Sequence, residues 1–184
     1  MRLRRKLQRL IDFGKDYFAL FGLAPRYRID PEQVERAYRA LQREIHPDRH
    51  AAGDEAQRRL ALQSSARVNE AYRTLKEPVA RAQYLLSLRG IDALAETHTA
   101  LPAEFLEREL ERREAVADAQ TAGAAPKLNE LLREVRADGG GLESRLAEEL
   151  EGEAWEAASD SVRELKFLAK VADDIEAALA DLES

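Results

Sequence analysis

The spacing of apolar residues is the feature that most restricts how this chain can fold. Between Val34 and Ile45 apolar residues recur every three or four positions, and the same spacing returns in 61–75 and 155–182. This spacing marks one face of an α-helix, whereas the two-residue alternation of a β-strand never persists beyond a few residues. The sequence therefore predicts an all-α fold.

Proline and acidic residues divide the first half of the helical pattern. After a short apolar helix at 17–23, Asp30 and Pro31 are a typical capping residue and first-turn residue. Pro47 ends that helix, because its ring disfavours helical geometry at the preceding residue. A second long helix follows and stops before Pro78. The first half is therefore predicted to be an antiparallel pair of long helices with short flanking helices.

The second half contains three further helical segments. One runs from Pro102 to about Ala119, a second from Lys127 to Leu150, and the last begins near Glu153. We expect the glycines at 139–141 to interrupt or bend the middle segment, because glycine costs about 1 kcal/mol relative to alanine inside a helix. These segments predict a C-terminal three-helix bundle. The expected organisation is a basic extension (1–15), a first helical domain (16–90), a linker (91–101) and the bundle (102–184).

Charge is divided unevenly along the chain. Residues 1–90 carry 19 Lys and Arg against 11 Asp and Glu, whereas residues 91–184 carry 10 against 24. The net charges of +8 and −14 suggest that the two halves face different partners. Six of the basic residues lie in 1–15, where a targeting peptide or membrane-surface helix is an alternative to a basic helical extension.

Composition excludes several classes of protein. The chain has no cysteine, which excludes disulfides, thiolate metal sites and a cysteine nucleophile. No apolar run approaches the roughly 20 residues that span a bilayer.

The tripeptide His46-Pro47-Asp48 is the sharpest motif of the first half. A His and an Asp in one turn could act as an acid–base pair, but no nucleophile or phosphate loop accompanies them. His46 and His50 could ligate a metal, but Pro47 breaks the helix that such a pair requires. The alternative is recognition, since proline holds the loop rigid and Asp48 can accept a bidentate arginine. The preceding helix also presents Arg36, Arg39 and Arg43 opposite its apolar stripe, which is either a binding face or an ordinary solvated face.

The helix after Pro102 carries a second candidate surface. At about 100° per residue, Leu106 and Leu110 border an acidic arc that ends about 140° from Leu106. The acidic residues of this arc are Glu107, Glu111, Glu114 and Asp118. The leucines belong either to the margin of the core or to a binding patch. In the last helix Phe167 lies off the apolar stripe, so it packs on a neighbouring helix or joins such a patch.

Four segments of the sequence resemble a known family. They are DYFALFGL at 16–23, LQREIHPDR at 41–49, NEAYRTL at 69–75 and PVARAQYLLSLRG at 78–90. A helix, a His-Pro-Asp loop and an antiparallel helix look like the J domain of DnaJ-type co-chaperones. Together the four segments resemble HscB, the J-type co-chaperone of iron–sulfur cluster assembly, and the likeness extends from about Asp16 to the C-terminus.

The resemblance implies that the J domain docks on an HscA-type heat-shock ATPase and stimulates it, while the chain itself is not an enzyme. It implies chaperone-binding roles for Arg36, Arg39, Arg43, His46, Pro47 and Asp48. It also implies that the bundle binds the cluster scaffold IscU through Leu106, Glu107, Leu110, Glu111, Glu114, Asp118 and Phe167. Glu107 is charged where an apolar residue also occurs in the family.

The expected protein is therefore a bacterial-type cytoplasmic adaptor without a cofactor or bound metal, and without a nucleic-acid or membrane partner. The alternatives are a general J-domain co-chaperone for other clients, and an acid–base or metal enzyme using His46 and Asp48.

Overall fold

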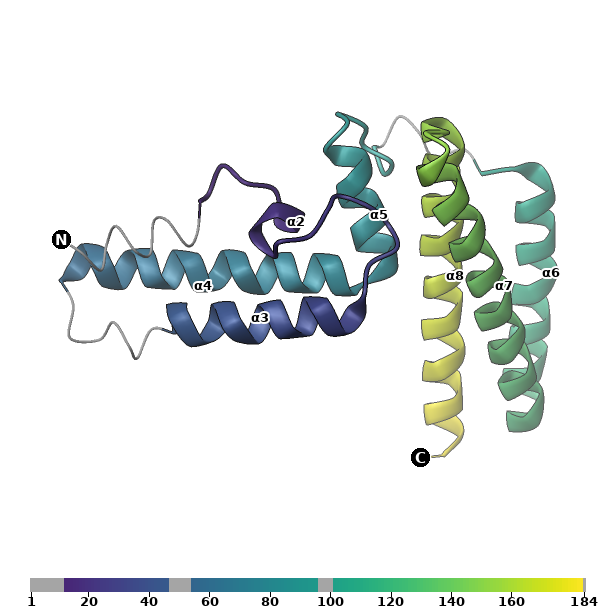
Figure 1. Cartoon of the computed structure of the whole chain (residues 1–184). Helices are drawn as coiled ribbons and strands as arrows, with labels where there is room; N and C mark the ends of the chain where they lie inside the picture. Colours follow the sequence, from purple (N-terminus) through teal and green to yellow (C-terminus); the bar gives the residue numbers. More distant parts are fainter. Residues whose placement is uncertain (1–11, 47–53, 96–100, 184) are drawn as a thin grey trace. The chain divides into compact units, whose positions relative to one another are not determined.

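The computed structural model describes residues 12–46, 54–95 and 101–183, and within these ranges it contains seven helices and no strand (Figure 1). The helices are α2 (Tyr17–Leu20), α3 (Pro31–Ile45), α4 (Glu55–Lys76), α5 (Pro78–Ser87), α6 (Ala103–Thr121), α7 (Ala125–Glu151) and α8 (Trp155–Leu182). The all-α prediction is confirmed. The chain divides into two compact units between Leu85 and Leu86, and each is described by itself. No helix among the described residues has the length and apolarity needed to span a membrane.

In the first unit α3 and α4 lie side by side in opposite directions, and α2 packs on α4 (Figure 1). Their apolar stripes meet in one core, and burial of each large side chain there stabilises the unit by about 1.5–3 kcal/mol. The buried members of this core are Phe18, Leu20, Phe21, Val34, Ile45, Val68, Ala71 and Leu75. The stripes that indicated helices in the sequence are therefore the surfaces that hold the pair together.

The predicted boundaries of α3 are confirmed in atomic detail. The carboxylate of Asp30 accepts a hydrogen bond from the backbone N–H of Glu32 at 2.9 Å, and Pro31 occupies the first turn. At the other end His46 has φ −52° and ψ 128°, the extended backbone favoured before a proline. The apolar segment at 17–23 forms only a four-residue helix, since Gly22 follows with φ +69°.

Tyrosines fix the register of α3 against α4. The rings of Tyr38 and Tyr72 stack with centroids 4.1 Å apart, and the Tyr38 hydroxyl donates to Asn69 Oδ1 at 3.0 Å. The Tyr72 hydroxyl donates to Glu35 Oε2 at 2.5 Å. This hydrogen bond, followed by one from Arg39, lowers the pKa of the Glu35 carboxyl below its ordinary value.

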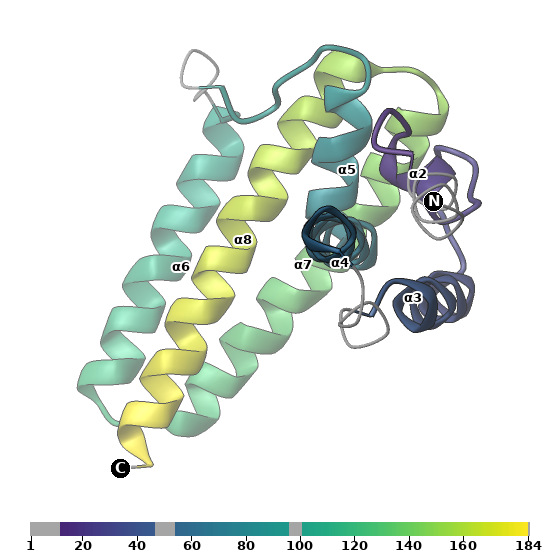
Figure 2. The same ribbon diagram turned by 90° about the vertical axis from the view of Figure 1, so that its left-hand side faces the viewer.

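The second unit contains the predicted three-helix bundle of α6, α7 and α8 (Figure 2). Helix α7 packs more extensively against α8 than against α6. The bundle core includes Phe105, Val116, Leu128, Leu131, Val135, Leu146, Val162, Leu165, Leu168 and Ile175, all of them buried.

The expected interruption at 139–141 is wrong, because α7 continues through all three glycines. Buried side chains on both sides of the run, Val135 before it and Leu142 and Leu146 after it, anchor the helix in the bundle. Their burial outweighs the cost of three glycines, about 2–3 kcal/mol at roughly 1 kcal/mol each.

Replacing Gly139, Gly140 or Gly141 by alanine should raise the free energy of unfolding by about 0.5–1 kcal/mol per site. A Cβ atom at any of the three positions meets no atom within 4 Å, so the helix gains propensity without a clash. Urea denaturation followed by circular dichroism measures the change. Gly123→Ala is the control and should destabilise the protein, because Gly123 has φ +63°. Lower stability in all three variants would contradict a continuous helix.

The substitution Tyr72→Phe should raise the pKa of Glu35, because it removes the hydrogen bond that most favours the ionised carboxyl. A lowered pKa stabilises the fold above the unfolded-state pKa, and this stabilisation is lost as pH falls through the folded-state pKa. The stability of the variant should therefore fall less steeply with pH in the acid range than that of the wild type. Titration of the Glu35 carboxyl carbon by NMR measures the shift, and Arg39→Gln should raise the pKa as well. An unchanged Glu35 titration in Tyr72→Phe would contradict the assignment.

Candidate functional site

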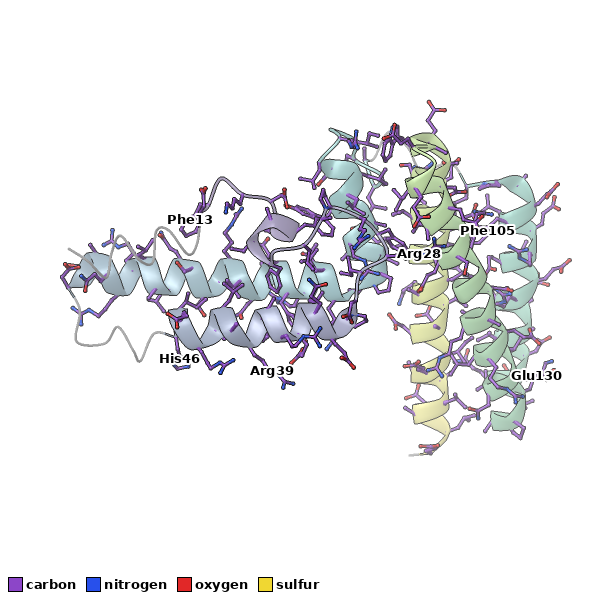
Figure 3. The ribbon with its side chains drawn as sticks, in the orientation of Figure 1. Phe13, Arg28, Arg39, His46, Phe105 and Glu130 are labelled. Atoms are coloured by element: carbon purple, nitrogen blue, oxygen red, sulfur yellow. The ribbon has the colours of Figure 1, made fainter. Side chains whose placement is uncertain are left out.

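The first candidate site lies at the C-terminal end of α3. His46 is exposed, and Figure 3 shows His46 and Arg39 on the side of α3 that is turned away from α4. Pro47 and Asp48 lie outside the described residues. The structure therefore describes one member of the predicted tripeptide, which directly follows the last helical residue.

The three arginines predicted from the sequence lie on the exposed surface of α3, and ion pairs already hold two of them. Arg36 pairs with Asp30 at 3.3 Å and with Glu32 at 3.1 Å. Arg39 Nε lies 2.8 Å from Glu35 Oε1, and Arg43 Nε donates to the Arg39 carbonyl at 3.3 Å. Exposed ion pairs contribute about 1 kcal/mol or less. Arg36 and Arg39 can therefore exchange these carboxylates for others at small cost.

A groove that the sequence interpretation missed lies between the start of α3 and the end of α4. It has a volume of about 480 Å³. Its lining combines apolar, basic and acidic side chains, among them Ile29, Val34, Leu75, Arg36, Arg39, Lys76, Arg81, Glu32 and Glu35. Helical spacing alone could not reveal it, because the groove depends on where two helix ends meet.

The second candidate site is the leucine patch on α6, which we define as Leu106 and Leu110 with the acidic arc beside them. Leu106 is 45% exposed and Leu110 is 61% exposed. All four carboxylates of the arc are exposed as well, on Glu107, Glu111, Glu114 and Asp118. The opposite face of α6 is buried through Phe105, Val116 and Ala119. The leucines therefore do not belong to the bundle core.

Phe167 of α8 extends this surface to a second helix. Its ring is half-buried and meets the ring of Phe105 edge-on, with centroids 5.6 Å apart and an interplanar angle of 80°. The guanidinium of Arg113 lies 4.8 Å from the centroid of the same ring. The sequence interpretation singled out Phe167 and overlooked Arg113, although the helical wheel places Arg113 beside Leu106.

Buried charges hold α6 in position beneath the leucine patch. Arg112 is buried and donates to the carboxylate of Glu109, which is buried too. The other end of its guanidinium reaches Asp138 of α7, with Nη2 2.5 Å from Oδ2. The sequence interpretation missed this cluster as well. A sequence signal did exist: on the helical wheel of α6, Glu109 and Arg112 fall on the same side as Phe105 and Val116.

The described residues contain no group of three or more His, Asp or Glu side chains that could hold a metal ion. What the structure offers chemically is two exposed surfaces on different units, one carrying arginines and the other apolar with an acidic border.

Two family descriptions match the chain. The DnaJ domain matches residues 16–84, and the HSCB C-terminal oligomerisation domain matches residues 101–176.

Curated relatives and a solved structure agree with these matches. The "Co-chaperone protein HscB homolog" of Azoarcus sp. is 42% identical over 175 residues, covering 95% of this chain and 99% of the relative. The homolog of Ralstonia nicotianae is 44% identical over 168 residues, covering 91% of this chain and 96% of the relative. The structure of the chaperone HscB from Vibrio cholerae has 36% identity and a TM-score of 0.81, covering 91% of this chain and 99% of that one.

Identity above 40% over nearly the full length of these relatives exceeds what a shared J domain alone would give. The predicted resemblance is confirmed: the chain belongs to the HscB family of J-domain co-chaperones.

Proposed function

We propose that this protein binds an IscU-type iron–sulfur scaffold protein and delivers it to an HscA/DnaK-class chaperone in the cytoplasm. It stimulates the ATPase of that chaperone and thereby assists iron–sulfur cluster assembly or transfer. The observation that carries the proposal is the leucine patch, in a chain that also has a J domain. The protein hydrolyses nothing itself.

On the chaperone side, the basic surface of α3 docks on an acidic surface of the ATPase. Arg36, Arg39 and Arg43 attract the partner and set the rate of encounter. His46, Pro47 and Asp48 then contact the chaperone and trigger hydrolysis. Arg36 and Arg39 pair with carboxylates of their own helix in the free domain, and carboxylates of the partner replace these on docking.

On the scaffold side, the leucine patch has the anatomy of a protein interface, with an apolar centre and a polar border. Leu106, Leu110 and Phe167 supply the apolar contact. The acidic residues Glu107, Glu111, Glu114 and Asp118 steer the patch toward a basic surface on the scaffold. In the free protein, two leucines four residues apart expose apolar surface to water, which is unfavourable. Binding of a partner buries that surface.

Two binding surfaces in one chain raise the concentration of the scaffold near the chaperone. Once both partners are bound to the same chain, the encounter of the scaffold with the chaperone becomes effectively intramolecular without any new contact. A general J-domain co-chaperone for other clients would use the same α3 surface but would not need the leucine patch for IscU.

The variant Leu110→Ala, alone and combined with Phe167→Ala, should weaken scaffold binding by about thirtyfold or more, the loss typical of a central interface residue. Stimulation of the chaperone ATPase in the absence of scaffold should survive. Isothermal titration calorimetry against the scaffold measures the affinity.

Leu62→Ala is the matched control, because Leu62 is 59% exposed against 61% for Leu110 but lies on α4. Circular dichroism checks that the bundle remains folded. Full scaffold affinity in a folded Leu110→Ala variant would remove the leucine patch from the interface and favour other clients.

Replacing Asp48 by Asn should abolish stimulation of the chaperone ATPase while leaving scaffold binding intact. The reason is loss of the carboxylate that accepts a partner arginine, a charge-assisted contact. Single-turnover ATP hydrolysis by the chaperone, with and without scaffold, measures the effect. Asp181→Asn, at an exposed position of α8, should behave as wild type. Turnover by this protein without a chaperone would favour the enzyme alternative.

A further inference from the structure

Arg113 occupies a distinctive position at the edge of the leucine patch. It is exposed, and its guanidinium carbon lies 4.8 Å from the centroid of the Phe167 ring. At about 100° per residue, Arg113 lies about 20° from Leu106, on the side opposite the acidic arc. The two leucines thus lie between a guanidinium on one side and four carboxylates on the other.

No carboxylate in the described parts of the chain pairs with Arg113. The nearest candidate on its own helix, Glu109 one turn earlier, receives Arg112. On the facing part of α8, Lys170 already pairs with Asp174 at 2.6 Å. Among the described residues, the contact of the Arg113 guanidinium is therefore with the face of an aromatic ring and not with a carboxylate.

Contact with Phe167 prepares this guanidinium for binding. With its carbon over the ring, the guanidinium of the exposed Arg113 keeps N–H donors that can match a carboxylate in a bidentate geometry. Because the ring already restricts the side chain, less conformational entropy is lost when a ligand binds.

We propose that Arg113 binds a carboxylate of the protein that docks on the leucine patch, and that this contact fixes the orientation of that partner. The inference rests on the proposed function, which supplies a scaffold protein as the occupant. The partner surface must then present an acidic side chain, an apolar centre and basic side chains in that order. A partner turned by half a revolution would place like charges together, which costs affinity.

A second arginine on the same helix provides a matched control. Arg108 is also exposed and lies over an aromatic ring, 5.7 Å from the centroid of Phe105. It is five residues earlier and about 160° from Leu106 on the wheel, away from the leucines. Its Nε also lies 3.9 Å from the Glu109 carboxylate.

The test is calorimetric titration of the IscU-type scaffold into the full chain carrying Arg113→Gln, Arg113→Met or Arg113→Lys. Gln and Met should each weaken binding by about tenfold, the value of one hydrogen-bonded charge. The Arg113→Lys variant should lose less affinity than these two, because lysine keeps the charge although it lacks the planar pair of donors. Arg108→Gln should bind as wild type.

Methionine separates charge recognition from mere support of the aromatic ring, because its side chain also packs well on Phe167. Met or Gln variants that bind within about twofold of wild type, or more tightly, would overturn the role of Arg113. If Leu110→Ala abolishes binding while Arg113 variants do not, this inference alone fails. If the wild-type chain does not bind the scaffold, the proposed function fails and this inference with it.

Discussion

Most of the stability of a helix in a protein comes from packing of its apolar face, so each described helix depends on burying one face against a neighbour. This constraint determines both units. Helices α3 and α4 share the core around Phe18 and Val68. Helix α7 packs extensively against α8. A helix that buries only one face leaves the other available for recognition. On α3 the available face carries arginines, and on α6 it carries leucines and carboxylates.

Partly buried polar contacts help to specify how these helices meet. Tyr72 of α4 donates to Glu35 of α3, and Arg112 of α6 bridges to Asp138 of α7. Removing one member of a buried ion pair leaves an uncompensated charge, which is strongly destabilising. Such pairs therefore discriminate against alternative alignments that an apolar stripe alone would tolerate. They keep the exposed face of each helix directed outward.

The sequence predicted the helices better than their interruptions. The boundary of α3 followed from Asp30, Pro31 and Pro47, whose effects are local and steric. The continuity of α7 across 139–141 did not follow, because local propensity favours a break and packing within the bundle opposes it. The buried pair of Glu109 and Arg112 was missed for a similar reason. Charged residues on a wheel are read as solvated unless a partner from another helix is known.

The leucine patch was accessible to sequence reasoning because it lies on one helix, where angular position follows from numbering. The relation of Phe167 and Arg113 was not, since it joins α8 to α6 through space. The groove between α3 and α4 escaped prediction for the same reason. Features of a single helix can be derived from its sequence, whereas features between helices require the fold.

The glycines of α7 have a mechanical consequence for the leucine patch. Asp138, which receives Arg112 of α6, directly precedes the first glycine. A turn without side chains resists bending less than its neighbours, because no Cβ atoms restrict its backbone. The anchor of α6 is thus attached beside the most compliant turn of α7. Bending at that turn would displace Asp138 and, through Arg112, the helix that carries the leucines.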